Sequence, residues 1–255
     1  MEVVINALFL SKEKELKERI ANFNSSGKLF DNRQRNTIKL FEFEGKTINI
    51  KSFKVPNLIN KVVYKYFRKS KAKRSYEYAT LLLEKGIGTP QPMAYFENFN
   101  WLGLEKSYYI SEHLQVELTY RELVEIPDYP NHETILRQFT RFTFDLHQHG
   151  IAFLDHSPGN TLIKKEANGK YSFYLVDLNR MAFHDQMSFE SRMQNFSRLT
   201  PKKEMIAVMS NEYSKCYTAK SEAEIVEKMW HETVQFQEEF AKKQQLKKKL
   251  KFWKS

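Results

Sequence analysis

Three polar side chains flank one predicted β-hairpin in the second half of the chain. The run LDHSPGN precedes the hairpin and the apolar run YSFYLV ends it, with an Asn-Gly-Lys turn at residues 168–170 between the two strands. This turn is typical of a type I′ hairpin. The acid and amide before the hairpin are Asp155 and Asn160, and the acid directly after it is Asp177. The second half is therefore restricted to folds in which a short hairpin carries polar groups at both ends.

This layout of acid, amide and acid suits phosphate transfer from ATP. Asp155 is the candidate catalytic base, because a carboxylate can orient an acceptor hydroxyl and take its proton. Asn160 and Asp177 are the candidate Mg²⁺ ligands, because amide and carboxylate oxygens are the hard donors that Mg²⁺ prefers. The structural alternative is an Asx turn in the loop and a strand-capping Asp177. The three residues together predict an ATP-dependent kinase.

The remaining pattern predicts a sheet-rich first half and a helical second half. Strands are expected at 37–43, 46–54, 107–114, 161–165 and 171–176, and helices at 12–24, 73–85, 131–149 and through most of 186–245. The first two strands turn at Glu44-Gly45. This order predicts an α+β, bilobal protein-kinase-like fold, with a small antiparallel-sheet lobe, a larger helical lobe and the nucleotide between them. The expected domains are an N-lobe at 1–114, a C-lobe at 115–241 and a basic tail at 242–255.

Lys51 is the candidate ligand of the α- and β-phosphates of ATP. Strand alternation places it on the same face as Phe53. Glu77 is the only acid within 46–83, and we predict that it pairs with Lys51, because such an ion pair positions the lysine on the phosphates. A solvated strand lysine is the structural alternative, and Lys54 is the competing lysine.

Other parts of the predicted ATP site have weaker signals. Ser111 and His113, at the end of the strand expected over 107–114, are further candidates for nucleotide binding. A glycine-rich phosphate loop is absent, because residues 28–44 hold no glycine. Backbone amides of a turn near 32–36, with its arginines, are the candidate phosphate cradle.

Four stretches together resemble a known family. They are INIKSFK, RSYEYATLLLEKGIGTPQP, DLHQHGIAFLDHSPGNTLI and LVDLNR, all within about Lys28 to Arg180. They are similar to the lipopolysaccharide core kinases, small bacterial enzymes with a protein-kinase-like fold that phosphorylate Kdo or heptose. The resemblance implies ATP, Mg²⁺ and a lipid-linked saccharide hydroxyl as acceptor. It carries the family's site pattern onto Lys51, Glu77, His147, Asp155, Asn160, Asp177 and Arg180.

One departure from the family supports a different reading. Phe153 stands where relatives have a histidine, two residues before the base. With the missing glycine loop, this favours a non-catalytic pseudokinase that binds a partner. A protein Ser/Thr kinase or another small-molecule kinase on the same fold is the second alternative. His147, His149 and His156 also allow a metal cluster, against the reading of His147 as a buried prop for the catalytic loop.

The net charge of +10 is unevenly distributed. Residues 242–255 hold seven lysines and no acid, and residues 51–76 hold nine lysines or arginines and no acid. The tail also carries Leu, Phe and Trp, which makes it a candidate for binding an anionic membrane surface, with a solvated tail as the alternative. Nucleic acid is not expected as a partner, and the oligomeric state is open.

The chain reads as a cytoplasmic protein. It begins without a secretory signal, contains no apolar run of the roughly 18 to 20 residues that span a bilayer, and has a single cysteine, Cys216, which suits a reducing compartment. Together with the basic tail, the resemblance to the lipopolysaccharide core kinases implies a peripheral location at the inner face of the bacterial inner membrane.

Overall fold

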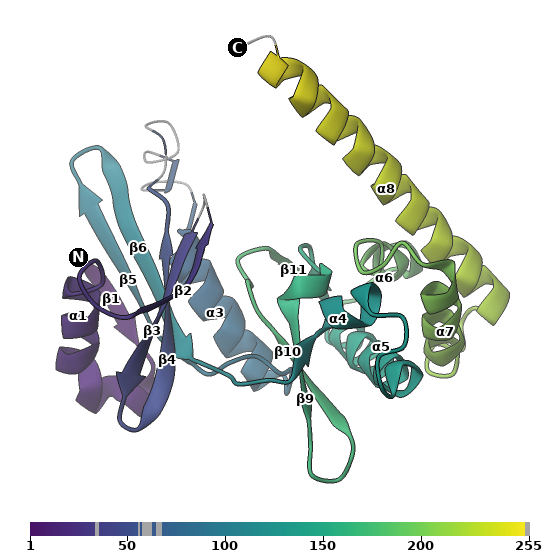
Figure 1. The fold of residues 1–255 in the computed structure, drawn as a ribbon, viewed down its shortest axis with the longest axis horizontal. Helices are drawn as coiled ribbons and strands as arrows, with labels where there is room; N and C mark the ends of the chain where they lie inside the picture. Colours follow the sequence, from purple (N-terminus) through teal and green to yellow (C-terminus); the bar gives the residue numbers. More distant parts are fainter. Residues whose placement is uncertain (34–35, 56, 58–62, 65–67, 253–255) are drawn as a thin grey trace. The chain divides into compact units, whose positions relative to one another are not determined.

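The computed structural model describes the chain except residues 34–35, 56, 58–62, 65–67 and 253–255, together with the side chains of Arg33 and 250–252. The described residues form two compact units, which Figure 1 shows as ribbons. Unit 1 comprises Met1–Gln115 and Leu175–Asn179, and unit 2 comprises Val116–Tyr174 and Arg180–Ser255. A short segment after the second hairpin strand thus belongs to the first unit.

Unit 1 is built on a six-stranded antiparallel sheet in the order β1-β5-β6-β4-β3-β2. The strands are β1 (Glu2–Ile5), β2 (Lys28–Arg33), β3 (Asn36–Phe43), β4 (Lys46–Phe53), β5 (Pro92–Asn100) and β6 (Gly103–Glu112). The predicted hairpin at Glu44-Gly45 is confirmed. Both turn residues have left-handed φ angles, 50° and 74°, as a type I′ turn requires. Strands β1, β2 and β5 were not predicted.

Strand alternation gives this sheet two apolar faces, each covered by a helix. Ile48 and Ile50 pack in one buried cluster with Leu16 of α1 (Glu13–Ala21), which a 3₁₀ helix (Ala7–Lys12) precedes. Phe53 packs on the opposite face with Ala72 of α3 (Lys71–Glu84). Lys51 is two residues before Phe53 and therefore lies on the same face, as predicted, and this is the face that α3 covers.

Unit 2 is mainly helical. Its elements are β7 (Leu118–Thr119), α4 (Tyr120–Glu125), α5 (His132–Gln148), β8 (Ile151–Phe153), a 3₁₀ turn (Pro158–Asn160), β9 (Thr161–Lys165), β10 (Tyr171–Leu175), β11 (Met181–Phe183), α6 (Phe189–Gln194), α7 (Lys203–Ser214) and α8 (Glu222–Phe252). The helix predicted over 131–149 is confirmed as α5. Its apolar face is buried against side chains of α7 and α8, which supplies much of the core of this unit.

The β9–β10 turn differs from the predicted type I′ turn. The amide of Gly169 donates to the carbonyl of Glu166 at 2.9 Å, and only Gly169 is left-handed, with φ of 76°. The side chain of Asn168 accepts from the amide of Lys170 at 3.0 Å and holds Asn168 outside the left-handed region. The loop is therefore a type I turn followed by a glycine bulge.

Helix α8 has two different halves. Its first half packs on α6 and α7, and Figure 1 shows the yellow second half running clear of the other helices of unit 2. The side chains of residues 238–249 are all exposed. Among the helices that the structure describes, none is long and apolar enough to cross a membrane.

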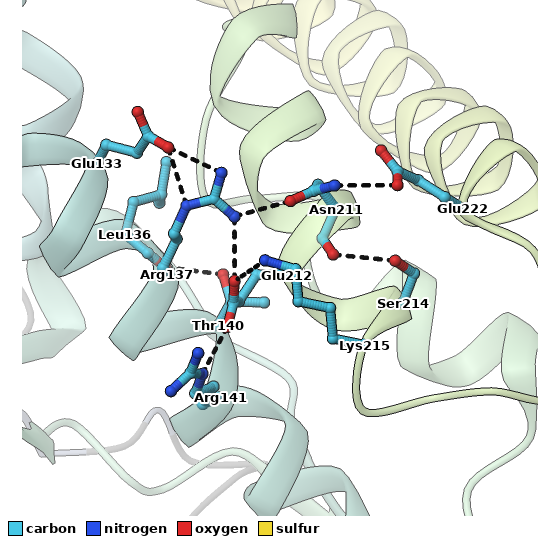
Figure 2. A network of polar contacts seen from close by, with 10 residues as sticks. All are labelled: Glu133, Leu136, Arg137, Thr140, Arg141, Asn211, Glu212, Ser214, Lys215 and Glu222. Atoms are coloured by element: carbon cyan, nitrogen blue, oxygen red, sulfur yellow. Dashed lines mark hydrogen bonds and ion pairs between the residues drawn. The ribbon is translucent and has the colours of Figure 1, made fainter.

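A buried acid joins α5 to α7. The Glu212 side chain is 1% exposed and accepts hydrogen bonds from Arg137 at 3.0 Å, Lys215 at 2.8 Å and Arg141, as Figure 2 shows. Burial alone would raise the pKa of this carboxyl. The hydrogen bonds from Lys215, Arg141 and Arg137 outweigh burial and lower the pKa to about 2.

Replacing Glu212 with glutamine is expected to lower the free energy of unfolding by about 2 to 3 kcal/mol at pH 7. The folded-state pKa lies below that of the unfolded chain, so this stabilisation is present above pH 4.5 and is lost as the pH falls toward 2. Urea unfolding at several pH values measures it. The control is Glu133→Gln, an exposed partner of Arg137 in the same network, expected to cost less than about 1 kcal/mol. Equal costs for the two variants would contradict the role of Glu212.

Candidate active site

Unit 1 brings two of the predicted residues together. The Lys51 ammonium donates a hydrogen bond to Asp177 Oδ1 at 2.8 Å, and the Asn179 amide nitrogen donates to the same oxygen at 2.6 Å. Lys51 is 9% exposed, so its aliphatic stem is buried in the α3 face of the sheet. Asp177 has a left-handed φ of 60°, a conformation that non-glycine residues adopt rarely and often at functional sites.

The loop before β5 holds the segment that carries Asp177. The amide of Leu175 donates to the carbonyl of Gly88 at 2.8 Å, and the buried hydroxyl of Thr89 donates to the carbonyl of Leu175 at 2.8 Å. These two bonds fix both backbone groups of Leu175, two residues before Asp177. The GIGTPQP loop therefore positions the candidate metal ligand.

Replacing Thr89 with valine is expected to cost about 1 to 2 kcal/mol of stability, because the buried carbonyl of Leu175 loses its hydroxyl donor while the side-chain shape is kept. If Asp177 binds Mg²⁺–nucleotide, affinity for that complex should also fall several-fold, since the loop no longer fixes the segment. Thr89→Ser should restore both properties. Thr80→Val, which removes a hydroxyl bonded to the Tyr76 carbonyl in α3, is the matched control and should leave nucleotide affinity unchanged. A Thr89→Val protein with unaltered affinity would contradict the positioning role.

The predicted Lys51–Glu77 ion pair is wrong for this structure. Glu77 accepts two hydrogen bonds from the Lys69 ammonium, at 2.9 and 2.8 Å, and Lys51 pairs with Asp177 instead. Lys69 lies directly before the Ser70 N-cap of α3, within reach of a helix residue two turns on. The tertiary fold brings Asp177 to Lys51, and that carboxylate takes the place expected for Glu77.

Ser111 and His113 lie at and just beyond the end of β6. Ser111 is buried, and its hydroxyl interacts with the Tyr109 hydroxyl. The amide of His113 donates to the carbonyl of Thr47 at 2.9 Å, and burial lowers the pKa of its imidazole. The contacts of Ser111 and His113 that the structure gives are thus with residues of unit 1, and their role in nucleotide binding stays a prediction. The centre of the candidate phosphate turn, residues 34–35, lies outside the described residues.

Asp155 lies in unit 2, two residues after the end of β8. Its Oδ1 pairs with the Arg198 guanidinium at 2.8 Å, and Arg180 Nη1 lies 3.8 Å from Oδ2. The side chain is 21% exposed, so a hydroxyl can reach it from solvent. Oδ2, which has only the distant arginine, is the oxygen better placed to accept a proton.

The Asn160 amide nitrogen donates to the backbone carbonyl of Asp155 at 2.8 Å. This bond closes the loop between the two residues and fixes the amide orientation. The Oδ1 atom is thereby left as the free end of the amide. A hard oxygen donor on a rigid loop fits Mg²⁺, which takes one or two protein ligands alongside phosphate and water.

His147 is buried and hydrogen-bonded next to the loop that carries Asp155, as predicted. The Asn195 amide nitrogen donates to the carbonyl of Phe153 at 2.9 Å, so the Asn195 amide oxygen faces His147 Nε2 at 3.2 Å. That oxygen can only accept, so Nε2 carries the hydrogen and donates the hydrogen bond. His147 Nδ1 then accepts from the Tyr213 hydroxyl at 2.9 Å, and that oxygen accepts from Arg192 at 3.2 Å. This buried chain of hydrogen bonds has one consistent direction.

Burial lowers the pKa of His147 to about 3, which keeps the imidazole neutral as this chain requires. Both of its nitrogens are hydrogen-bonded, so neither is available to a metal. In the described part of the chain no three His, Cys, Asp or Glu side chains gather as a metal site, and the histidine-cluster alternative has no support. Asn195 also explains how the loop is held although Phe153 replaces the expected histidine.

Sequence reasoning missed three residues of this region: Thr89, Asn195 and Arg198. Thr89 lies in the quoted GIGTPQP motif, so a signal for it existed. Asn195 and Arg198 lie beyond Arg180, in a stretch of helical pattern with no motif. Nothing in the local sequence distinguishes them from surface residues.

Comparison with known proteins identifies the fold. No protein-family model and no curated protein matches the sequence. Among solved structures, WaaP in complex with acyl carrier protein matches with a TM-score of 0.62 at 15% identity, over 92% of this chain and 99% of that chain. The chain has the fold of WaaP, a lipopolysaccharide core heptose kinase.

The WaaP match confirms the predicted α+β kinase-like fold. A Stt7 homolog from Micromonas algae, soaked with ATP, matches more weakly, with a TM-score of 0.43 at 14% identity over 61% of this chain and 49% of that chain.

Proposed function

We propose that the protein transfers the γ-phosphate of ATP to a sugar hydroxyl of the lipopolysaccharide or lipooligosaccharide inner core, either Kdo or heptose. The observation that carries the proposal is the Lys51–Asp177 pair, in a chain whose fold matches WaaP along almost its whole length. Burying a lysine and holding an aspartate at a left-handed φ both cost free energy of folding. A role in stability alone therefore does not account for this pair.

In unit 1, Lys51 is proposed to bind the ATP phosphates and Asp177 to be a Mg²⁺ ligand. In unit 2, Asn160 is proposed as a Mg²⁺ ligand. The metal, when bound, neutralises negative charge on the transferring phosphate. Lys51 and Asn179 fix the direction of the Asp177 carboxylate through their two hydrogen bonds. Glu77 then has no direct part in orienting Lys51 in this conformation.

In unit 2, Asp155 is proposed to accept the proton of the acceptor hydroxyl through Oδ2. Its other oxygen is held by Arg198, and its backbone carbonyl is held by Asn160. The chain from Arg192 through His147 to the Phe153 carbonyl fixes the strand that leads into this loop. The protein thus contributes position and charge, which is most of what phosphate transfer requires.

Two alternatives remain in the same fold: a protein Ser/Thr or other small-molecule kinase, and a pseudokinase. The test is Mg²⁺-dependent transfer from γ-labelled ATP to extracted core lipopolysaccharide, with casein and free sugars as competing acceptors. Label entering the glycolipid alone would support the proposal. Label entering casein would favour a protein kinase. ATP binding without transfer to any acceptor, or no ATP binding, would favour the pseudokinase.

We further propose that the exposed end of α8 attaches the protein to the cytoplasmic face of the inner membrane, where a lipid-linked acceptor is found. Phe240 and Leu246 are exposed there beside the lysine run. Lysines near an anionic surface contribute about 1 kcal/mol each, so attachment should be strong and sensitive to salt.

Deleting residues 242–255 is expected to reduce binding to vesicles containing anionic lipid by at least about tenfold at 0.1 M salt, without changing the unfolding temperature, because residues 242–249 are exposed. Vesicle co-sedimentation measures this. Leu246→Ser with all lysines kept separates apolar insertion from charge. Undiminished sedimentation after the deletion would rule out the tail as the anchor. Acyl carrier protein, the molecule bound to WaaP in its solved structure, can be added to the same assay. If it also binds this chain, it should sediment together with the vesicle-bound protein.

A further inference from the structure

A hollow of about 430 Å³ lies beside Asp155 within unit 2. Its floor is the segment 152–154, which directly precedes Asp155, and its walls come from β11, from α6 with the turn that follows, and from Phe236 of α8. The lining mixes apolar surface with hydroxyl and amide groups, notably Ser191 and Gln194. Among the described residues that line it, none is acidic.

Arg198 connects this hollow to the candidate base. Its side chain lines the hollow, pairs with Asp155 at 2.8 Å and donates to the carbonyl of Leu154 at 2.9 Å. Its guanidinium carbon lies 5.3 Å from the centroid of the Phe236 ring, which supports the cation from α8. The Nε atom is buried and has no hydrogen-bond partner among the described residues. A buried guanidinium donor without an acceptor is costly, so Arg198 has hydrogen-bonding capacity that the described residues do not use.

The charge around the loop is positive. Arg180 lies 3.8 Å from Asp155, and Arg121 is close enough to Gly159 that a side chain there would meet its guanidinium at 2.7 Å. Arg121 has a weak exposed partner, Glu125 at 3.8 Å. With Arg198, three cations therefore adjoin a loop that carries one carboxylate. Such an excess attracts an anion to the position next to the base.

We propose that this hollow is the acceptor subsite and that it selects a sugar bearing an anionic substituent, a carboxylate or a phosphate, with Arg198 as the specificity-determining residue. This rests on the proposed kinase function and narrows its acceptor class. The planar guanidinium binds carboxylate or phosphate through two parallel hydrogen bonds. Because the same group holds Asp155, binding of the anion positions the sugar against the base.

The test is isothermal titration of the full chain, without nucleotide, against three probes. These are a methyl glycoside of Kdo, which carries a carboxylate, glucose 6-phosphate, which carries a phosphate, and a neutral methyl heptoside. At least one anionic sugar should bind about tenfold or more tightly than the neutral heptoside, because its anion gains charge-assisted hydrogen bonds. The stronger of the two anionic probes identifies which anion the hollow prefers. Equal binding of the neutral and both anionic sugars would overturn the proposal.

Arg198→Gln should abolish the preference for the anionic sugar. Arg141→Gln, which removes the same charge from an exposed arginine of α5 away from the hollow, should keep it. Arg198→Lys keeps a cation without the planar guanidinium and should bind the anionic sugar at least about threefold more weakly. This variant provides the test if Arg198→Gln does not fold. An unchanged preference in folded Arg198→Gln, or in Arg198→Lys when only that variant folds, would overturn the assignment.

The two proposals can fail separately. Anionic sugars that bind as described but receive no phosphate from ATP would leave the subsite standing and remove the kinase assignment. Transfer to neutral sugars that is unaffected by Arg198→Gln would keep the kinase and remove the subsite.

Discussion

Replacing Asp155 with alanine is expected to lower the kcat of ATP-dependent phosphate transfer by about 10²- to 10⁴-fold, the usual contribution of a general base. The acceptor hydroxyl would lose the carboxylate that orients it and takes its proton. Binding of Mg²⁺–ATP should change little, because Lys51 and Asp177 are untouched. Steady-state transfer from γ-labelled ATP, with nucleotide affinity measured by titration, checks both parts.

Two variants make this result specific. Asp145→Ala removes an exposed aspartate from α5 of the same unit and should leave kcat unchanged. Asp155→Asn keeps the shape and can still bond to Arg198 through its amide oxygen, but it cannot act as a base. Loss in both Asp155 variants identifies proton transfer as the missing step. Loss in alanine alone would point to positioning by Arg198, and full activity in both would remove Asp155 from the reaction.

Replacing Asp177 with asparagine is expected to weaken Mg²⁺–ATP binding by about 10- to 100-fold, because the carboxylate that binds the metal is lost. Asparagine tolerates the left-handed φ of 60° better than alanine does, so strain does not confuse the result. Lys51 also loses the charge of its partner, 2.8 Å away. Titration with ATP in the presence and absence of Mg²⁺ measures the effect.

The Mg²⁺ dependence is the deciding quantity for Asp177. In the metal-free titration Asp177→Asn and the unaltered protein should bind ATP about equally. When Mg²⁺ is added, the unaltered protein and the control should gain affinity, and Asp177→Asn should not. Asp185→Asn, an exposed aspartate of unit 2, is the control. The same gain on adding Mg²⁺ in all three proteins would show that Asp177 is not a ligand.

Features that depend on near neighbours were predictable. The Glu44-Gly45 hairpin and helix α5 follow from turn chemistry and from apolar periodicity, which act over a few residues. The loop from Asp155 to Asn160 is also local, because its closing hydrogen bond joins residues five apart. The turn after β9 was mispredicted even so, since the side chain of Asn168 formed a bond that kept it out of the left-handed region.

Contacts between distant residues were not predictable in the same way. Thr89 bonds to Leu175 across 86 positions, and Asn195 bonds to Phe153 across 42. Thr89 lies in the GIGTPQP motif and Asn195 lies in no motif, but the residues around each of them do not reveal its partner. Their function follows only from the backbone carbonyl that the fold places opposite each of them.

The sequence by itself determined which groups are available for chemistry: the lysine on its strand face, the candidate base and the amide in one loop, and the acid after the hairpin. Tertiary structure alone decided their partners. Lys51 pairs with Asp177, 126 residues away, although Glu77 is much nearer in the chain. The physical reason is that hydrogen bonds and ion pairs act over about 3 to 4 Å, so their partners are set by how strands and helices pack.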